Sequence, residues 1–139
     1  MLADGANCNM FEYRGTTDVY FVDFRDLYVD GNHENNTSGR FLYSPQPGSE
    51  RLADVRILNV YCRDFPDEGI YTENPWGWRI VGCVIEMCGG PGVHVTKGSD
   101  FALINNKINK NDIGAKLGTN GARIIGNYFL SLIHISEPT

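Results

Sequence analysis

The sequence predicts an all-β fold, a right-handed parallel β-helix of about four to five coils with roughly 21–23 residues in each coil. A short pattern recurs at nearly constant spacing, which is typical of a solenoid built from one supersecondary unit per repeat. Apolar residues alternate with period two over short stretches, so the unit contains strands rather than helices. Gly, Asn and Asp separate these stretches and predict tight turns between the strands.

Two patterns carry the repeat. The first has apolar residues at its first and sixth positions and Asn, Gly or Asp at its third, and it begins at residues 24, 57, 80, 103 and 124, with steps of 33, 23, 23 and 21 residues. The second pairs Gly with an alternating apolar strand and begins at Gly69, Gly92 and Gly114, with steps of 23 and 22 residues. An insertion at 31–54, made of two turn-rich loops around a short strand at 41–43, explains the one long step.

Equivalent residues of successive coils should stack about 4.8 Å apart, because the strands pair in parallel. Asn106 and Asn127 are expected to stack at a bend, where side-chain amides can hydrogen-bond along the axis. We expect three inward columns, made of Ile57, Ile80, Leu103 and Ile124, of Cys62, Ile85, Ile108 and Phe129, and of Ile70, Val93 and Ala115.

The run at 103–114, LINNKINKNDIG, resembles the β-helix repeats of the pectate-lyase-like superfamily, and the resemblance covers about four fifths of the chain. That superfamily includes polysaccharide lyases, glycoside hydrolases, sugar epimerases, phage tailspikes and non-enzymatic surface proteins, so the resemblance is specific for fold and weak for activity. It implies a polysaccharide as the partner. The catalytic signatures of its polygalacturonases, alginate epimerases and pectate lyases are not matched, so no cofactor is expected, and calcium stays open only for a longer parent protein.

The sequence indicates a β-helix fragment at 1–129, with the insertion at 31–54, followed by a tail at 130–139. A solenoid without caps exposes core and strand edges, and neither end offers a cap, so we expect a fragment of a longer protein. The tail, LSLIHISEPT, departs from the repeat and resembles a translated sequencing adapter. An ordinary final strand at 132–135 is the alternative.

Composition narrows the classes of binding partner. The formal net charge is −5 and no Lys/Arg block occurs, which argues against nucleic acid. No apolar run approaches the roughly 20 residues that span a bilayer, so no membrane partner is expected. A neutral glycan or a cationic partner fits the charge better, and the first residues do not form a secretory signal.

The candidate site lies around the strand that follows each Gly of the second pattern. Tyr71, His94 and Lys116 should face outward there as a column, between the acidic stretch before Gly69 and the 73–78 stretch after it. Aromatic rings can stack on the apolar face of a sugar, and carboxylates can serve as acid and base or nucleophile. An ordinary solvated surface is the alternative. We expect Asp67, Glu68 and His94 as catalytic residues and Tyr71, Glu73, Trp76 and Lys116 as substrate-binding residues.

Leu58, Val81, Ile104 and Ile125 should form an outward apolar column that needs a cover, either the 31–54 insertion, another domain or another copy of the chain. A strand assignment wrong by one residue would turn this column inward. We therefore consider two hypotheses for the function. The first is part of an extracellular or virion-associated polysaccharide lyase or glycoside hydrolase. The second is a non-catalytic β-helix of a tailspike or cell-surface protein that mediates homotrimer or domain contacts.

Metal binding is not expected. His33 lies beside Asp30 and Glu34 in a polar loop, where a solvated side chain is the simpler interpretation. The four cysteines, Cys8, Cys62, Cys83 and Cys88, lack a paired CxxC spacing. Buried free thiols are the main expectation, with a bridge between Cys83 and Cys88, metal binding or catalysis as alternatives.

Overall fold

The computed structural model describes residues 1–15, 17–46, 52–130 and 135–136. Strands dominate it, and helix accounts for 2% of the chain, in a single 3-10 turn, η1 (His33–Asn35). This confirms the predicted all-β class. In the described residues, no helix has the length and apolar character needed to cross a membrane.

The strands are short on the N-terminal side and long near the middle of the chain. They are β1 (Phe11–Glu12), β2 (Val19–Tyr20), β3 (Asp23–Arg25), β4 (Tyr28–Asp30), β5 (Leu42–Ser44), β6 (Leu52–Ala53), β7 (Arg56–Leu58), β8 (Tyr61–Arg63), β9 (Ile70–Glu73), β10 (Trp76–Val81), β11 (Val84–Glu86), β12 (Pro91–Ile104), β13 (Lys107–Asn109), β14 (Ile113–Ile125), β15 (Tyr128–Leu130) and β16 (Ile135–Ser136).

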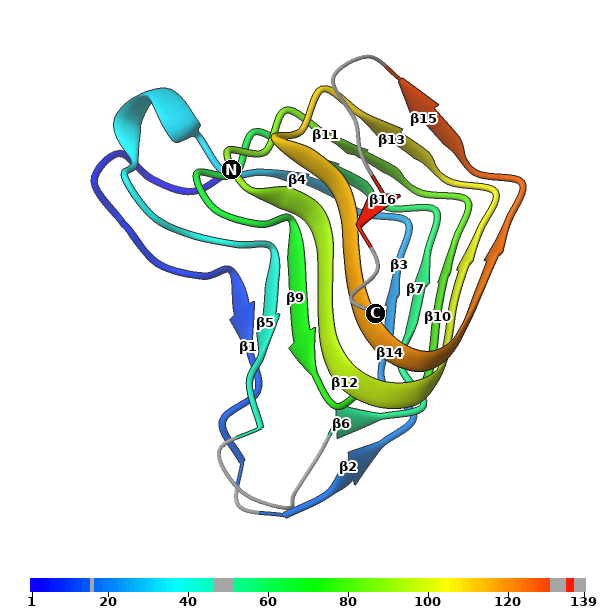
Figure 1. The fold of residues 1–139 in the computed structure, drawn as a ribbon. Coiled ribbons are helices and arrows are strands. Elements are labelled where there is room, and N and C mark those ends of the chain that lie inside the picture. Colours follow the sequence, from blue (N-terminus) through cyan, green and yellow to red (C-terminus); the bar gives the residue numbers. More distant parts are fainter. Residues whose placement is uncertain (16, 47–51, 131–134, 137–139) are drawn as a thin grey trace.

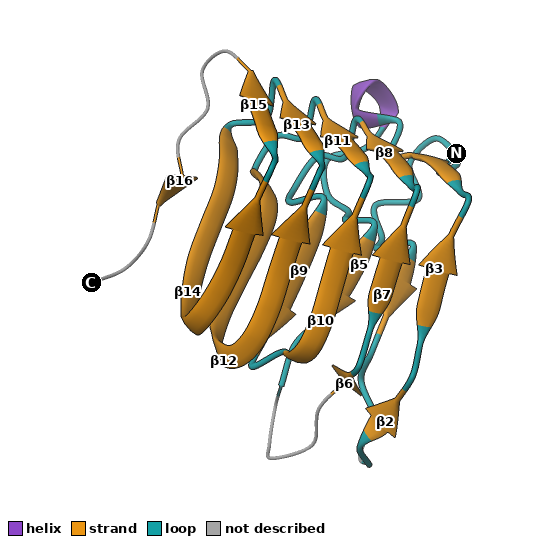
Figure 2. Cartoon of the chain, turned by 90° about the vertical axis from the view of Figure 1, so that its right-hand side faces the viewer, coloured by secondary structure: helices purple, strands orange, loops and turns teal. Residues whose placement is uncertain are grey.

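Parallel pairing between successive coils builds three walls around one core (Figure 1). The first wall contains β1, β5, β9 and the N-terminal halves of β12 and β14. The second contains β3, β7, β10 and the C-terminal halves of β12 and β14. The third contains β4, β8, β11, β13 and β15. Because β12 and β14 bend from the first wall into the second, these two walls form one continuous sheet (Figure 2).

The solenoid has about three turns, slightly fewer than the four to five coils expected. The coils on the N-terminal side are less regular than the repeat suggests, since β1 to β4 have only two or three residues each. Their steps are also longer, because Asp23 pairs with Arg56 in β7 whereas Arg56 pairs with Arg79 in β10. The repeat length therefore settles only from β7 onward.

One residue per coil makes the corner between the second and third walls. These residues have φ between 51° and 66°, the left-handed region that Gly and Asn adopt at least cost. This corner explains why the first sequence pattern requires Asn, Gly or Asp at its third position. The corner residues are Asp26, Asn59, Gly82, Asn105 and Gly126.

The three inward columns are confirmed by the strand register and by burial. Ile57, Ile80 and Leu103 are all 0% exposed and lie directly above one another on the second wall. The register extends the three columns to Phe24, Val29 and Leu42 on the N-terminal side. A buried apolar core thus runs continuously along the solenoid axis.

The amide ladder is also confirmed. Asn106 accepts a hydrogen bond at Oδ1 from the Cys83 N–H at 2.9 Å, and its Nδ2 donates to Ile80 O and to Asn127 Oδ1, both at 2.9 Å. The Asn127 amide in turn donates to Leu103 O at 2.8 Å. These side-chain amides hydrogen-bond to backbone N–H and C=O groups that point inward at the corner, where the strands do not pair.

The 31–54 segment contributes to the walls as well as to loops. Its short strand, expected at 41–43, is β5, which pairs with β1 and β9, and its end forms β6. In the tail, residues 131–134 and 137–139 lie outside the described residues, so most of the adapter-like stretch has no structural account. The described pair, β16, lies parallel to β14.

We predict that Asn106→Ala lowers the free energy of unfolding by about 2–4 kcal/mol, because the buried Cys83 N–H and Ile80 carbonyl both lose their partner. Chemical denaturation measures the change. Asn120→Ala, at an exposed position of β14, is the control and should change the free energy by less than about 0.5 kcal/mol. Equal effects of the two substitutions would contradict the role of the ladder.

Candidate functional site

The outward column on the first wall occurs as predicted. Strand register places Tyr43, Tyr71, His94 and Lys116 above one another, starting from Glu12. Their neighbours along each strand are buried, so the alternation of a pleated strand turns these side chains away from the core. Glu12 and Lys116, at the two ends of the column, are exposed, whereas Tyr43, Tyr71 and His94 between them are half-buried.

Glu68 is the centre of a charged cluster beside this column. Its Oε1 accepts a hydrogen bond from Arg40 Nε at 2.7 Å, and its Oε2 lies 2.9 Å from His94 Nδ1. The Glu68 side chain is 12% exposed, that of His94 18% and that of Arg40 24%, so these polar contacts are largely shielded from water. The three residues come from three successive coils, and parallel stacking alone brings them together.

Backbone contacts hold Arg40 and Glu68 in place. Asp67 accepts a hydrogen bond at Oδ2 from the Gly39 N–H at 2.9 Å, and the Asp67 N–H donates to Gly39 O at 3.2 Å. These two bonds fasten the turn before β5 to the turn before β9. The side chains that follow, Arg40 and Glu68, therefore leave the two turns side by side.

Electrostatics keep Glu68 ionised. Burial raises its pKa, but hydrogen bonds from His94 and Arg40 lower it by more, so the pKa of Glu68 lies below its usual range. A carboxylate only accepts hydrogen bonds, so the Nδ1 of His94 carries the proton that it shares with Glu68. In neutral His94 the lone pair is then on Nε2, which is the arrangement of a histidine base oriented by a carboxylate.

Aromatic rings pack along the same column. Tyr43 and Tyr71 have ring centroids 5.3 Å apart, and the Tyr71 ring meets His94 edge-on at 5.0 Å. The Arg40 guanidinium lies over the Tyr43 ring at 4.6 Å. Burial and a hydrogen bond donated to Glu73 at 2.7 Å raise the pKa of Tyr71 to about 12, so its hydroxyl is neutral at ordinary pH.

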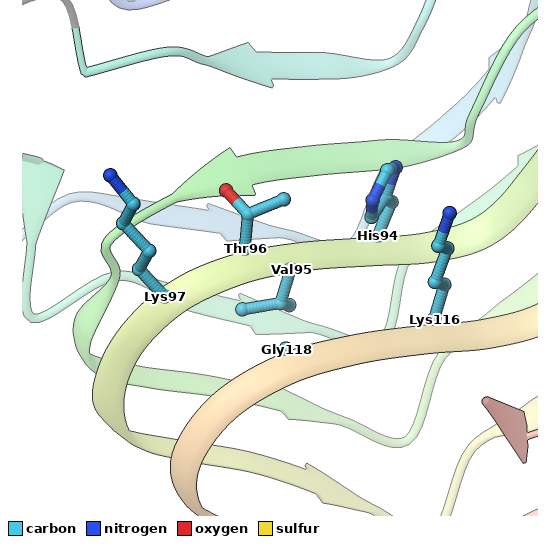
Figure 3. Close-up of a pocket in the computed structure, with 6 residues that line it drawn as sticks. All are labelled: His94, Val95, Thr96, Lys97, Lys116 and Gly118. Carbon is cyan, nitrogen blue, oxygen red and sulfur yellow. The ribbon is translucent and has the colours of Figure 1, made fainter. Parts of the chain in front are cut away.

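A hollow of about 320 Å³ opens where the column reaches β14. Figure 3 shows the side chains of His94, Thr96, Lys97 and Lys116 rising on the same side of the two strands. Gly118 is the register partner of Thr96, and its missing side chain leaves the space. We call this the basic hollow, defined by His94, Val95, Thr96, Lys97, Lys116 and Gly118.

The basic hollow contains two of the seven predicted site residues, His94 and Lys116. Glu68 and Tyr71 lie behind it and contact His94 directly. The remaining three residues do not line the hollow, although Glu73 is the register partner of Thr96 in the preceding coil. Asp67 is bound to the turn at Gly39, Glu73 accepts from the Tyr71 hydroxyl, and Trp76 is 47% exposed at the start of β10.

Sequence reasoning missed Arg40, Thr96, Lys97 and Gly118. Thr96 and Gly118 follow from extending the second pattern by two residues, because the step of 22 that relates His94 to Lys116 also relates them. Arg40 was hidden in the 31–54 segment, which breaks the regular period. Lys97 has φ of 56°, a left-handed turn conformation that lysine adopts uncommonly. The residue type therefore gave no reason to expect Lys97 at this turn.

Metal ligands do not gather in the described residues, where no group of three His, Cys, Asp or Glu side chains could hold an ion. All four cysteines are free, and Cys62, Cys83 and Cys88 are buried as expected. Cys8 is exposed, which corrects the expectation for that residue, because its loop lies outside the coil. Burial raises the pKa of both Cys62 and Cys83, so these thiols are protonated core residues.

Comparison of the chain with protein-family models, with curated proteins and with solved structures finds no significant match.

We predict that Glu68→Gln lowers stability at neutral pH by roughly 2 kcal/mol, because it removes the close carboxylate partner of Arg40 and leaves only the 4.0 Å contact with Asp67. The folded pKa of Glu68 is depressed, so its ion pairs stabilise the fold above the ordinary carboxyl pKa of 4.5 and lose this effect as the pH falls through the folded pKa. Denaturation at a series of pH values should show a shallower acid decline in the variant.

The control is Asp112→Asn, which removes an exposed carboxylate at the turn before β14 and should leave the acid decline as in the parent protein. An unchanged acid decline in Glu68→Gln would show that the carboxylate does not stabilise the fold through its charge.

Proposed function

We propose that this chain is part of a polysaccharide lyase that cleaves uronate-containing glycans by β-elimination, with His94 as the base. The observation that carries the proposal is His94 itself, held at Nδ1 by an ionised Glu68 and lining the basic hollow with Lys97 and Lys116. The hollow, at about 320 Å³, is at the lower end of the range of ligand sites, about 300–1,000 Å³.

Lysines in the hollow suit the first requirement of this chemistry. The hydrogen at C5 of a uronate is acidic only when the adjacent carboxylate is neutralised, since the developing negative charge spreads onto that group. Lys97 and Lys116 supply positive charge in the hollow, and its lining contains no described acidic residue. Thr96 adds a hydroxyl to the lining, where it also hydrogen-bonds to Tyr71.

His94 suits the second requirement. Its Nε2 takes the C5 proton, and the electron pair of that C–H bond becomes the C4–C5 double bond. The C4–O glycosidic bond breaks with its electrons on the leaving oxygen, which takes a proton from the solvent in the open hollow. The Glu68 carboxylate stabilises the imidazolium that forms, as the acidic partner of a catalytic histidine does elsewhere.

The carboxylates favour elimination over hydrolysis. A glycosidase needs a protonated acid with a raised pKa beside an ionised carboxylate. Glu68 instead has a lowered pKa, Asp67 is bound to the backbone of Gly39, and Glu73 accepts from Tyr71. The lowered pKa of Glu68 therefore does not suit the protonated acid of a glycosidase.

Lys97 supports the proposal independently of its charge. It adopts the left-handed conformation with φ of 56°, at the bend where the preceding coil has Asn74 with φ of 51°. Asn adopts this conformation readily, and lysine does so at a cost. A functional lysine explains why this less favourable residue occurs at the edge of the basic hollow. An extracellular, cell-surface or virion setting follows from a polysaccharide substrate.

The test is incubation of the full chain with polygalacturonate and with alginate, following the ultraviolet absorbance of the unsaturated product. We expect cleavage of at least one uronate polymer, and His94→Gln should lower turnover by about 10²–10⁴-fold, as loss of a general base does. Lys116→Ala should raise KM more than it lowers kcat, because it removes charge that binds the carboxylate.

Lys107→Ala is the matched control, since Lys107 is an exposed lysine on the third wall. Full activity in this variant excludes a general effect of net charge. Cleavage that survives His94→Gln, or no cleavage of either polymer, would contradict the proposal.

A second function, homotypic assembly, rests on a separate observation. Leu58, Val81, Ile104 and Ile125 stack in register on the second wall, as expected. The first three are half-buried, and Ile125 is 54% exposed. The described part of the 31–54 segment belongs to other strands of the solenoid, so another copy of the chain is the cover that we propose for this column.

Sedimentation equilibrium tests this assembly. We expect an oligomer in the parent protein and a monomer in the double variant Ile104→Glu/Ile125→Glu, because two buried charges would oppose the contact. Asn120→Glu adds the same charge at another exposed position of β14 and should leave the oligomer intact. A monomeric parent protein would exclude the assembly.

A further inference from the structure

A second hollow, of about 310 Å³, lies at the corner between the second and third walls, whereas His94 lies on the first wall. It forms because the corner position is Asn59 in one coil and Gly82 in the next. A Cβ at Gly82 would meet no atom within 4 Å, so the space above this glycine is open. We call it the corner hollow, lined by Asp26, Leu27, Tyr28, Asn59, Val60, Tyr61, Gly82 and Val84.

Two tyrosines form one side of the corner hollow. Tyr28 and Tyr61 are register partners on the third wall, with ring centroids 5.2 Å apart and planes inclined by 37°. The hydroxyl of Tyr61 donates to Glu86, which fixes the orientation of that ring. Tyr28 packs against Tyr61 and is still 60% exposed, so the Tyr28 ring offers an aromatic surface to the solvent.

A polar pair lies at the corner itself. The Asn59 amide donates to Asp26 Oδ1 at 2.9 Å, and both side chains are exposed. A carboxylate has about four lone-pair sites and an amide has two N–H donors and an acceptor oxygen, so this pair can bind further hydroxyl groups. An aromatic face next to such a pair is the arrangement that binds a sugar ring, with C–H groups on the ring and hydroxyls at the edge.

Charge decides which sugar fits. None of the described residues that line the corner hollow is a lysine or an arginine, although Arg63 outside the lining hydrogen-bonds to Tyr28, and Asp26 at the corner would repel an anionic sugar. β-Linked glucose has only C–H groups on its two ring faces, because all of its ring substituents are equatorial, so it stacks best on a tyrosine. We propose that the corner hollow binds one neutral pyranose ring of a β-linked glucan, at a site separate from the basic hollow.

The site is independent of the lyase chemistry. It lies on another wall, it contains no residue that we assign to proton transfer, and its test measures binding instead of turnover. A chain that binds a neutral glucan at the corner hollow and cleaves no uronate would support this inference and exclude the lyase.

The experiment is calorimetric titration of the full chain with cellohexaose, in the parent protein and in two variants of the hollow. We expect saturable binding, with Tyr28→Ala weakening it roughly tenfold, because aromatic anchors supply most of the energy of such contacts. Asn59→Gly removes the amide and keeps a residue that adopts the left-handed corner, and it should weaken binding about threefold to tenfold. Circular dichroism and thermal unfolding verify that both variants fold.

Tyr128→Ala is the matched control. Tyr128 is 56% exposed on the outer face of the same wall, but it lies four strands away from Tyr28 and outside the corner hollow. Binding unchanged in this variant and in His94→Gln supports the site. Equal losses in Tyr28→Ala and Tyr128→Ala, loss of binding in His94→Gln, or no binding of cellohexaose would each overturn it.

Discussion

Parallel pairing of each coil with the next is the interaction on which the rest of the structure depends. It requires every coil to turn at the same places, so one residue per coil adopts a left-handed conformation between the second and third walls. Where that residue is Asn or Gly the turn costs little, and this explains the third position of the sequence pattern. Equivalent residues of successive coils therefore stack directly above one another. This stacking produces the inward columns and the amide ladder.

The same stacking assembles the candidate site from residues distant in the sequence. Arg40 and Glu68 are 28 residues apart, and Glu68 and His94 are 26 apart, yet each pair is in contact. A charged residue at the edge of a strand meets the edge of the next coil, so three successive coils bring a cation, a carboxylate and an imidazole together. Glu68 stays ionised because two donors from neighbouring coils outweigh the effect of its burial on the pKa.

The sequence predicts the regular part of this molecule well and its irregular part poorly. From β7 onward the steps of 21–23 residues gave the inward columns, the outward apolar column and the order Tyr71, His94, Lys116. The period did not predict Arg40 as a site residue, because the coil that contains Arg40 departs from that period. The roles of Glu68 and Asp67 could not be separated either, since adjacent acidic residues look alike in sequence and differ only in which loop each one contacts.

The net charge of the whole chain was the sequence property that predicted the chemistry of the candidate sites least well. A value of −5 suggested a neutral or cationic partner, whereas the basic hollow contains two lysines and a histidine with no described acidic residue in its lining. The corner hollow has the opposite character, with Asp26 and no described basic residue. A solenoid permits this contrast because each wall has its own outer face, and charges on different walls are separated by the core. A chain of this fold can therefore present surfaces of different charge on different walls.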